Sequence, residues 1–239
     1  MRHMLFAWVA AAVTAVAILA TAGPAAAAVP ANAAFQSSAR FGAWNNGGFI
    51  VFNNEWNGSA GPQTVWARSF HDWGAVSTQQ AGNTAVETYP SVQKNFSNTP
   101  VSSFSLIQNG YTESMPANRN GLDAEAADDV WLNNFNIEVM IWVDNHGQRP
   151  AGRVIGHATI FGQHFAVWHT GSIFSFVLDH NETSGRTHVL ASLRWLMSHG
   201  LISRSVTLTQ VDFGWEIAST GSQPRDFVMP NYWLHTQRV

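Results

Sequence analysis

Two glutamates at the centres of strand-like runs are the residues of this sequence best placed to do chemistry. Glu138 lies in the run 136–142 (NIEVMIW) and Glu216 in the run 211–217 (VDFGWEI), and alternate residues of both runs are large and apolar. Because a β-strand sends successive side chains to opposite faces, the apolar residues would face a core and the two carboxylates would point the other way. Two carboxylates on a rigid sheet are what glycoside hydrolysis requires, one as nucleophile and one as acid/base.

The neighbours of Glu138 distinguish it from an ordinary solvated glutamate. Met140 and Trp142 share its face, and apolar side chains of this size are costly to leave in water unless that face is a cleft. Asn54 and Trp56 would likewise lie on one face of an earlier strand. Aromatic rings stack on the apolar face of a pyranose, and asparagine supplies both donors and acceptors for hydroxyls. These residues are candidate sugar contacts, with ordinary surface positions as the alternative.

A third carboxyl, Asp129, follows from the same alternation. In the run 128–132 (DDVWL) the apolar valine and leucine would face the core, which leaves Asp129 on the opposite face. If this strand pairs with the Glu138 strand as a short hairpin through 133–134, Asp129 would lie near Glu138. A neighbouring carboxyl could share a proton with Glu138 and tune its charge.

Composition excludes several classes of function. Hydrophobic residues make up 46% of the 239 residues and charged residues 11%, so a large core is available. The formal net charge of -3 has no basic block, which argues against a nucleic-acid partner because phosphates require clustered Lys and Arg. The ten histidines follow no metal-ligand spacing, and no G-x-S-x-G elbow is present. We therefore predict no metal, no cofactor and no serine nucleophile.

The N-terminal segment differs from the rest of the chain. A short basic start is followed by the apolar stretch 5–20 and by the small-residue patterns AAA (26–28) and ANA (31–33). This order predicts a secretory signal peptide over residues 1–33, and hence a secreted, extracellular protein. A membrane anchor is the alternative, but the apolar stretch is short for it. After cleavage we expect no membrane association, and the absence of cysteine leaves stability to packing rather than disulfides.

Residues 34–239 are predicted to form one domain. Short apolar alternations separated by Gly, Asn, Ser and Thr indicate many antiparallel strands, hence a sandwich or barrel. Examples of these alternations are 48–52, 64–67, 103–107 and 173–178. The segment 187–199 (THVLASLRWLMSH) instead has apolar residues at helical spacing and is followed by Gly200, which predicts one amphipathic helix packed outside a sheet. Nothing in the sequence requires more than a monomer.

With these motifs the sequence resembles glycoside hydrolase family 12, the small endo-β-1,4-glucanases and xyloglucanases. The matching segments, in the order of the family, are 53–56 (NNEW), 89–92 (YPSV), 129–132 (DVWL), 137–142 (IEVMIW) and 213–216 (FGWE). Together with the helical segment they cover nearly all of the chain after residue 33. The E-x-M-I-W strand followed downstream by F-G-x-E is the most specific part of this resemblance.

The resemblance implies an all-β fold, a concave β-jelly roll of two stacked antiparallel sheets with one helix. It implies an endo-β-1,4-glucanase that cleaves cellulose-type β-glucans with retention of configuration. In that mechanism Glu138 is the nucleophile, Glu216 is the acid/base and Asp129 is the partner of the nucleophile. The implied glucose-contacting residues of the cleft are Asn54, Trp56, Met140 and Trp142.

The sequence also departs from the family pattern. Ile217 and Ala218 stand where many members have Pro-Phe, and Glu55 and Asn57 interrupt the N-N-L-W-G form. These departures leave the preferred glucan open among cellulose, mixed-linkage glucan and xyloglucan. One alternative is a xyloglucan-specific endoglucanase, and another is a non-catalytic, lectin-like sandwich, which would need neither glutamate. The related xylanase jelly rolls fit the E-x-M-I-W run poorly.

Overall fold

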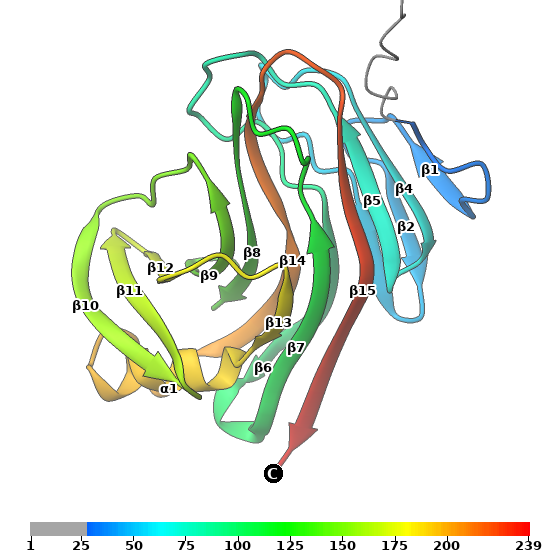
Figure 1. Ribbon diagram of the computed structural model, residues 1–239. Coiled ribbons are helices and arrows are strands. Elements are labelled where there is room, and N and C mark those ends of the chain that lie inside the picture. Colours follow the sequence, from blue (N-terminus) through cyan, green and yellow to red (C-terminus); the bar gives the residue numbers. More distant parts are fainter. Residues whose placement is uncertain (1–27) are drawn as a thin grey trace, which may run out of the picture.

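The structure is a computed structural model that describes residues 28–239 (Figure 1). Residues 1–27, which hold most of the predicted signal peptide, lie outside the described part. Fifteen strands and one α-helix are arranged in two sheets, and the first strand begins at Phe35. The predicted all-β sandwich with one helix is confirmed. In residues 28–239 no helix is long and apolar enough to cross a membrane.

The larger sheet has nine strands and carries both predicted catalytic glutamates. From edge to edge its strands are β10 (Arg153–Ile160), β11 (Gln163–Thr170), β12 (Ile173–Leu178), β9 (Ile137–His146), β8 (Leu122–Leu132), β14 (Thr207–Thr220), β6 (Ser91–Pro100), β3 (Phe49–Phe52) and β2 (Ala43–Asn46). Glu138 lies on β9, Asp129 on β8 and Glu216 on β14. These three strands are neighbours at the centre of the sheet.

The smaller sheet has six strands and packs against part of the larger one. Its order is β1 (Phe35–Ser37), β4 (Gln63–Ser69), β5 (Asp72–Ser77), β15 (Arg225–Arg238), β7 (Phe104–Ser114) and β13 (Ser184–Thr187). Figure 1 shows β10 and β11 on the opposite side of the molecule from β1 and β4. The nine-stranded sheet therefore has a core-facing side and a second side that is free to form a cleft.

The alternation of side chains along the central strands is as predicted. Val139 and Ile141 of β9 and Val211 of β14 are buried in one hydrophobic cluster. Phe213 and Trp215 of β14 are buried in a second cluster beneath the six-stranded sheet. Burial of these apolar side chains fixes the faces of the strands, because a register shift of one residue would turn the whole apolar set outward.

One pairing departs from the predicted antiparallel arrangement. Strand β12 runs parallel to β9, with Ser175 opposite Met140 and Val177 opposite Trp142. The chain leaves β9, forms β10 and β11, and then returns through β12 to the free edge of β9. Strands β10, β11 and β12 alternate in direction, so the parallel pairing of β12 with β9 means that β10 also runs in the direction of β9. All other strand pairs among the described residues are antiparallel.

The predicted helix is present as α1 (Val189–Ser198), and Gly200 follows it with a left-handed φ of 69°. Leu193 and Leu196 are buried in the same hydrophobic cluster as the core-facing side of β9. The helix lies next to β7 and β10 and covers the part of the nine-stranded sheet that the six-stranded sheet leaves open. Its apolar stripe is thus core, as predicted.

The prediction of a strand at residues 53–56 is wrong. Strand β3 ends at Phe52, and the following residues have no regular structure. Asn54 has a left-handed φ of 40°, a conformation that ends a strand and that asparagine tolerates better than most residues. Asn53 is buried beneath this loop, where its amide donates to the Glu55 carboxylate at 2.6 Å. Glu55 is thus held by the buried Asn53, and it is not among the residues that line the cleft.

The packing of α1 gives a first prediction. Leu193→Ala removes a fully buried side chain and should lower the free energy of unfolding by about 3 kcal/mol. Met197→Ala is the control on the same helix. Because Met197 is only partly buried, its truncation should cost about 1 kcal/mol. If urea denaturation shows the same loss in free energy of unfolding for both variants, the placement of the helix is wrong.

Candidate active site

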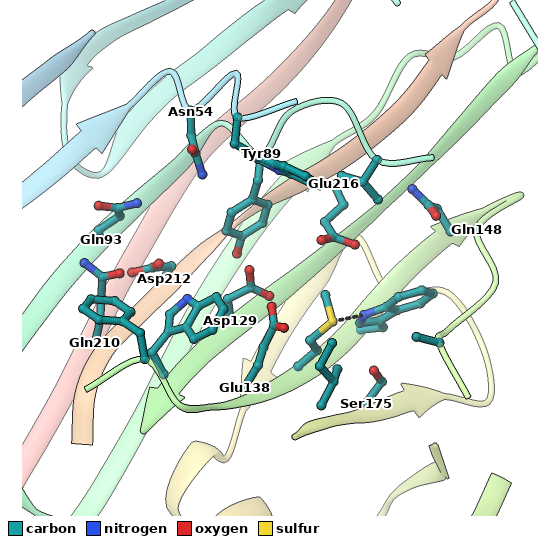
Figure 2. A pocket seen from close by; sticks show the side chains of 18 of the residues that line it. Asn54, Tyr89, Gln93, Asp129, Glu138, Gln148, Ser175, Gln210, Asp212 and Glu216 are labelled. Carbon is teal, nitrogen blue, oxygen red and sulfur yellow. Dashed lines mark hydrogen bonds between the residues drawn. The ribbon is translucent and has the colours of Figure 1, made fainter. Parts of the chain in front are cut away.

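A cleft with a volume of about 730 Å³ runs over the side of the nine-stranded sheet that faces away from the core. Figure 2 shows Glu138, Asp129 and Glu216 with their carboxyl groups turned toward one another at its centre. The structure brings all the predicted site residues to this one cleft. They are Asn54, Trp56, Asp129, Glu138, Met140, Trp142 and Glu216.

The hairpin between β8 and β9 places Asp129 near Glu138, as predicted. Its last pair is Leu132 with Ile137, so the connecting loop is 133–136. Asp129 pairs with Met140, one position along the same face from Glu138. The predicted proximity of the two carboxyls is therefore confirmed by the strand register.

Met140 and Trp142 form an apolar wall beside Glu138. Both are almost fully buried although they face the cleft, and the Trp142 indole N–H donates to the Met140 sulfur at 3.5 Å. A rigid apolar wall keeps water away from the neighbouring carboxyl and lowers the local dielectric constant. Asn54 and Trp56 lie on the opposite rim, and Trp56 is half exposed.

Gly214 explains how another cleft residue reaches the site. A Cβ at Gly214 would lie 2.1 Å from the carbonyl oxygen of Pro90. Only glycine at position 214 therefore lets residues 89–91 lie this close to β14. Tyr89 is thereby held inside the cleft, where its hydroxyl donates to the backbone oxygen of Ala127 at 3.0 Å. The sequence contains the Y-P-x-V motif at 89–92, but its pattern does not predict Tyr89 as a site residue. Its place depends on the contact between residues far apart in the chain.

Two further carboxyls, Glu125 and Asp212, were also missed. Glu125 lies directly opposite Glu216 in the β8–β14 pair, and Asp212 lies directly opposite Asp129. Both side chains are buried. Alternation along one strand does predict that Glu125 shares a face with Asp129, and that Asp212 shares a face with Glu216. What the sequence lacked was the register that joins the strands.

Burial raises the pKa of every carboxyl in this cluster, and the charges of neighbouring carboxyls add to this effect for all of them except Glu138. Burial, followed by the charges of Glu216 and Asp129, raises the pKa of Glu125 well above its ordinary range. Burial, followed by the charge of Glu138, does the same to the pKa of Asp129. For Asp212 burial is again the largest cause of a pKa well above the usual value.

The two predicted catalytic residues have intermediate values. Burial raises the pKa of Glu138 to about 7. Burial and the charge of Glu138 raise the pKa of Glu216 to about 7, against a lowering effect from its hydrogen bond with Glu125. The side chains of Glu138 and Glu216 are also more exposed than those of the other three carboxyls, Glu125, Asp129 and Asp212. Burial therefore favours the protonated forms of the three buried carboxyls, and the similar pKa values of Glu138 and Glu216 let this pair hold one proton near neutral pH.

A pair of carboxyls with one shared proton supplies an acid and a nucleophile in the same cleft. No group of three or more His, Cys, Asp or Glu side chains in the described part of the chain could hold a metal ion. The chemistry that this arrangement supports is proton transfer and nucleophilic attack by carboxyl groups.

The sandwich fold and the paired carboxyls in its cleft define a glycoside hydrolase of the jelly-roll class. The chain belongs to glycosyl hydrolase family 12, whose sequence profile matches residues 47–235. The resemblance proposed from the motifs is thus confirmed, and a hydrolase replaces the lectin-like alternative. No curated protein sequence matches the chain.

Solved structures of family members share the fold. The chain is similar to endoglucanase 3 of Trichoderma harzianum, at 22% identity and a TM-score of 0.76, over 88% of this chain and 100% of that one. It is similar to the family 12 xyloglucanase of Bacillus licheniformis, at 22% identity and a TM-score of 0.72, over 85% and 100%. A third is the xyloglucanase domain of NopAA from Sinorhizobium fredii in complex with cellobiose, at 20% identity and a TM-score of 0.73, over 85% and 99%.

The carboxyl cluster predicts how stability depends on pH. A carboxyl whose pKa is raised by folding contributes stability at low pH and loses it as the pH rises above its unfolded value. Wild-type protein should therefore lose thermal stability between pH 5 and pH 8. Asp212→Asn, which is neutral throughout, should show a smaller difference in Tm between these pH values.

Asp72→Asn is the matched control for this substitution. Asp72 is partly exposed and pairs with Arg68 at 2.9 Å on the six-stranded sheet, outside the carboxyl cluster. Its replacement should leave the difference in Tm between pH 5 and pH 8 as it is in the wild type. If Asp212→Asn behaves like Asp72→Asn, Asp212 does not hold a proton in the folded state.

Proposed function

We propose that this protein is an endo-acting β-1,4-glucanase that cleaves internal bonds of cellulose-type β-glucans by a retaining double displacement. The observation that carries the proposal is the pair Glu138 and Glu216, which lie in one cleft of a family 12 fold and both have a pKa of about 7. Retaining hydrolysis requires one ionised and one protonated carboxyl. The resemblance at the E-x-M-I-W strand assigns the ionised role to Glu138.

The first step forms a covalent intermediate. The Glu138 carboxylate attacks the anomeric carbon, and the glycosidic bond breaks as Glu216 donates its proton to the leaving oxygen. In the second step Glu216, now ionised, takes a proton from water while the water oxygen attacks the same carbon. The ester bond to Glu138 breaks, and the product leaves with its original configuration.

Asp129 acts on Glu138 in this proposal. Burial and the charge of Glu138 favour the protonated form of Asp129, which can donate a hydrogen bond to the neighbouring Glu138 while that group is charged. Such a bond favours the ionised nucleophile without adding a negative charge. Met140 and Trp142 exclude water from the same side of the cleft.

The substrate class is proposed from the cleft and from family members. A volume of about 730 Å³, with half-exposed aromatic side chains at the rim, suits an oligosaccharide segment. The similar proteins named above include an endoglucanase, xyloglucanases and a complex with cellobiose. Release of reducing ends from carboxymethylcellulose, mixed-linkage glucan, xyloglucan and xylan would identify the preferred polymer. Activity on xyloglucan alone would favour the xyloglucan-specific alternative.

Substitution of the two glutamates tests their roles separately. Glu138→Gln should lower kcat more than about a thousandfold on every substrate, because no nucleophile remains. Glu216→Gln should lower kcat/KM similarly on polymers, but much less on a dinitrophenyl glycoside, whose leaving group needs no proton. Added azide should restore turnover of Glu216→Gln on that substrate and yield a β-glycosyl azide.

The stereochemical course is a separate check on the mechanism. NMR of the first reducing ends released from a β-glucan should show the β-anomer before mutarotation. First release of the α-anomer would rule out double displacement, even if both glutamates prove essential.

We also propose that the enzyme is secreted and works as a monomer, with residues 1–33 removed on export. The support for export is the order of the N-terminal segment, basic, apolar and then small residues. The intact mass of protein recovered from the culture medium should correspond to a chain that begins at residue 34. Full-length protein retained with the membrane fraction would favour the anchor instead.

A further inference from the structure

Two aromatic side chains to which the proposed mechanism gives no role lie at one end of the cleft. Phe135 is 51% exposed and lines the cleft together with Trp131. Their ring centroids are 5.8 Å apart and the rings are tilted by 54°. Trp131 pairs directly with Glu138 across β8 and β9, so the two rings begin next to the proposed nucleophile.

The loop that carries Phe135 holds the ring in a fixed and unusual conformation. Asn133, Asn134 and Phe135 have φ values of 51°, 55° and 64°, and only the asparagines tolerate this region well. Side chains from neighbouring strands fix the loop. The backbone N–H of Asn134 donates to Asn98 Oδ1 at 2.9 Å, and that of Thr207 donates to Asn133 Oδ1 at 2.9 Å. A phenyl ring is thus presented to the cleft on a rigid support.

A second exposed phenylalanine shows that a left-handed backbone and an exposed ring do not by themselves indicate a binding site. Phe161, in the turn between β10 and β11, has a φ of 49° and is 77% exposed. It stacks on His188 with ring centroids 3.9 Å apart, and it does not line the cleft. What distinguishes Phe135 is its place beside Trp131 inside the cleft.

The strands next to these rings supply polar groups. Gln210 pairs directly with Trp131, and its amide donates to Asn95 Oδ1 at 2.6 Å, which fixes the side chain. Asp212 is buried, with its Oδ1 atom free of any hydrogen-bond partner among residues 28–239. Figure 2 shows Gln210 and Asp212 together on the side of Asp129 away from Gln148. An apolar ring surface bordered by amide and carboxyl groups matches a pyranose, which has apolar faces and a polar rim.

We propose that Trp131 and Phe135 form an aromatic platform on which a glucose unit of the substrate stacks, beyond the units that flank the cleaved bond, with Gln210 and Asp212 beside its hydroxyls. The proposal rests on the proposed β-glucanase function and adds a binding site to it. Because the ring is already exposed and held in place, binding requires little reordering of the protein.

The test compares short and long substrates. In Phe135→Gly the ratio of kcat/KM for cellohexaose to that for cellotriose should fall about tenfold, since only the longer chain reaches the platform. Phe135→Asn should lower the ratio similarly. Glycine and asparagine both accept the left-handed backbone, so the Tm of either variant should equal or exceed that of the wild type.

Phe161→Gly is the matched control, because it makes the same substitution at an exposed phenylalanine with a left-handed backbone outside the cleft. Its ratio should equal that of the wild type. An unchanged ratio in both Phe135 variants would overturn the platform while leaving the glucanase function intact. Wild-type protein that releases no reducing ends from any β-glucan would instead contradict the proposed function itself.

Discussion

The burial of five carboxyl groups on one face of three adjacent strands is the constraint on which the site depends. Glu125, Asp129, Glu138, Asp212 and Glu216 all have a raised pKa, and burial is the largest cause in each case. So many neighbouring carboxyls on one face of a sheet cannot all be charged, because each additional charge would be opposed by desolvation and by its neighbours. The folded protein must hold protons there, and a shared proton is what acid and nucleophile need.

The remainder of the fold maintains this unfavourable arrangement. The apolar side chains beneath β9, β8 and β14 set which face each carboxyl occupies, and the sandwich core keeps that choice fixed. Gly214 lets Tyr89 enter the cleft, while Met140 and Trp142 keep water from one side of Glu138. Burying the carboxyls lowers the stability of the fold, and the packing of the apolar core offsets this loss. Functional sites commonly carry such a cost in stability.

Features that depend on alternation within one strand could be predicted from the sequence. Glu138, Met140 and Trp142 share a face because of their spacing alone, and the β8–β9 hairpin is local enough to place Asp129. Features that depend on distant pairing could not. The register of β14 on β8 brings Glu125 to Glu216, and a left-handed backbone at Asn54 turns an expected strand into a loop. The parallel return of β12 likewise follows from the path of the chain in space.

The central claim is that Glu138 forms the bond to the sugar and Glu216 moves the proton. The most direct measurement traps the intermediate with a 2-deoxy-2-fluoro cellobioside that carries a good leaving group, followed by mass spectrometry of the digested protein. The account predicts a glycosyl ester on the peptide that contains Glu138, lost on incubation with an acceptor sugar. A label on Glu216, or inactivation without any covalent sugar, would contradict it.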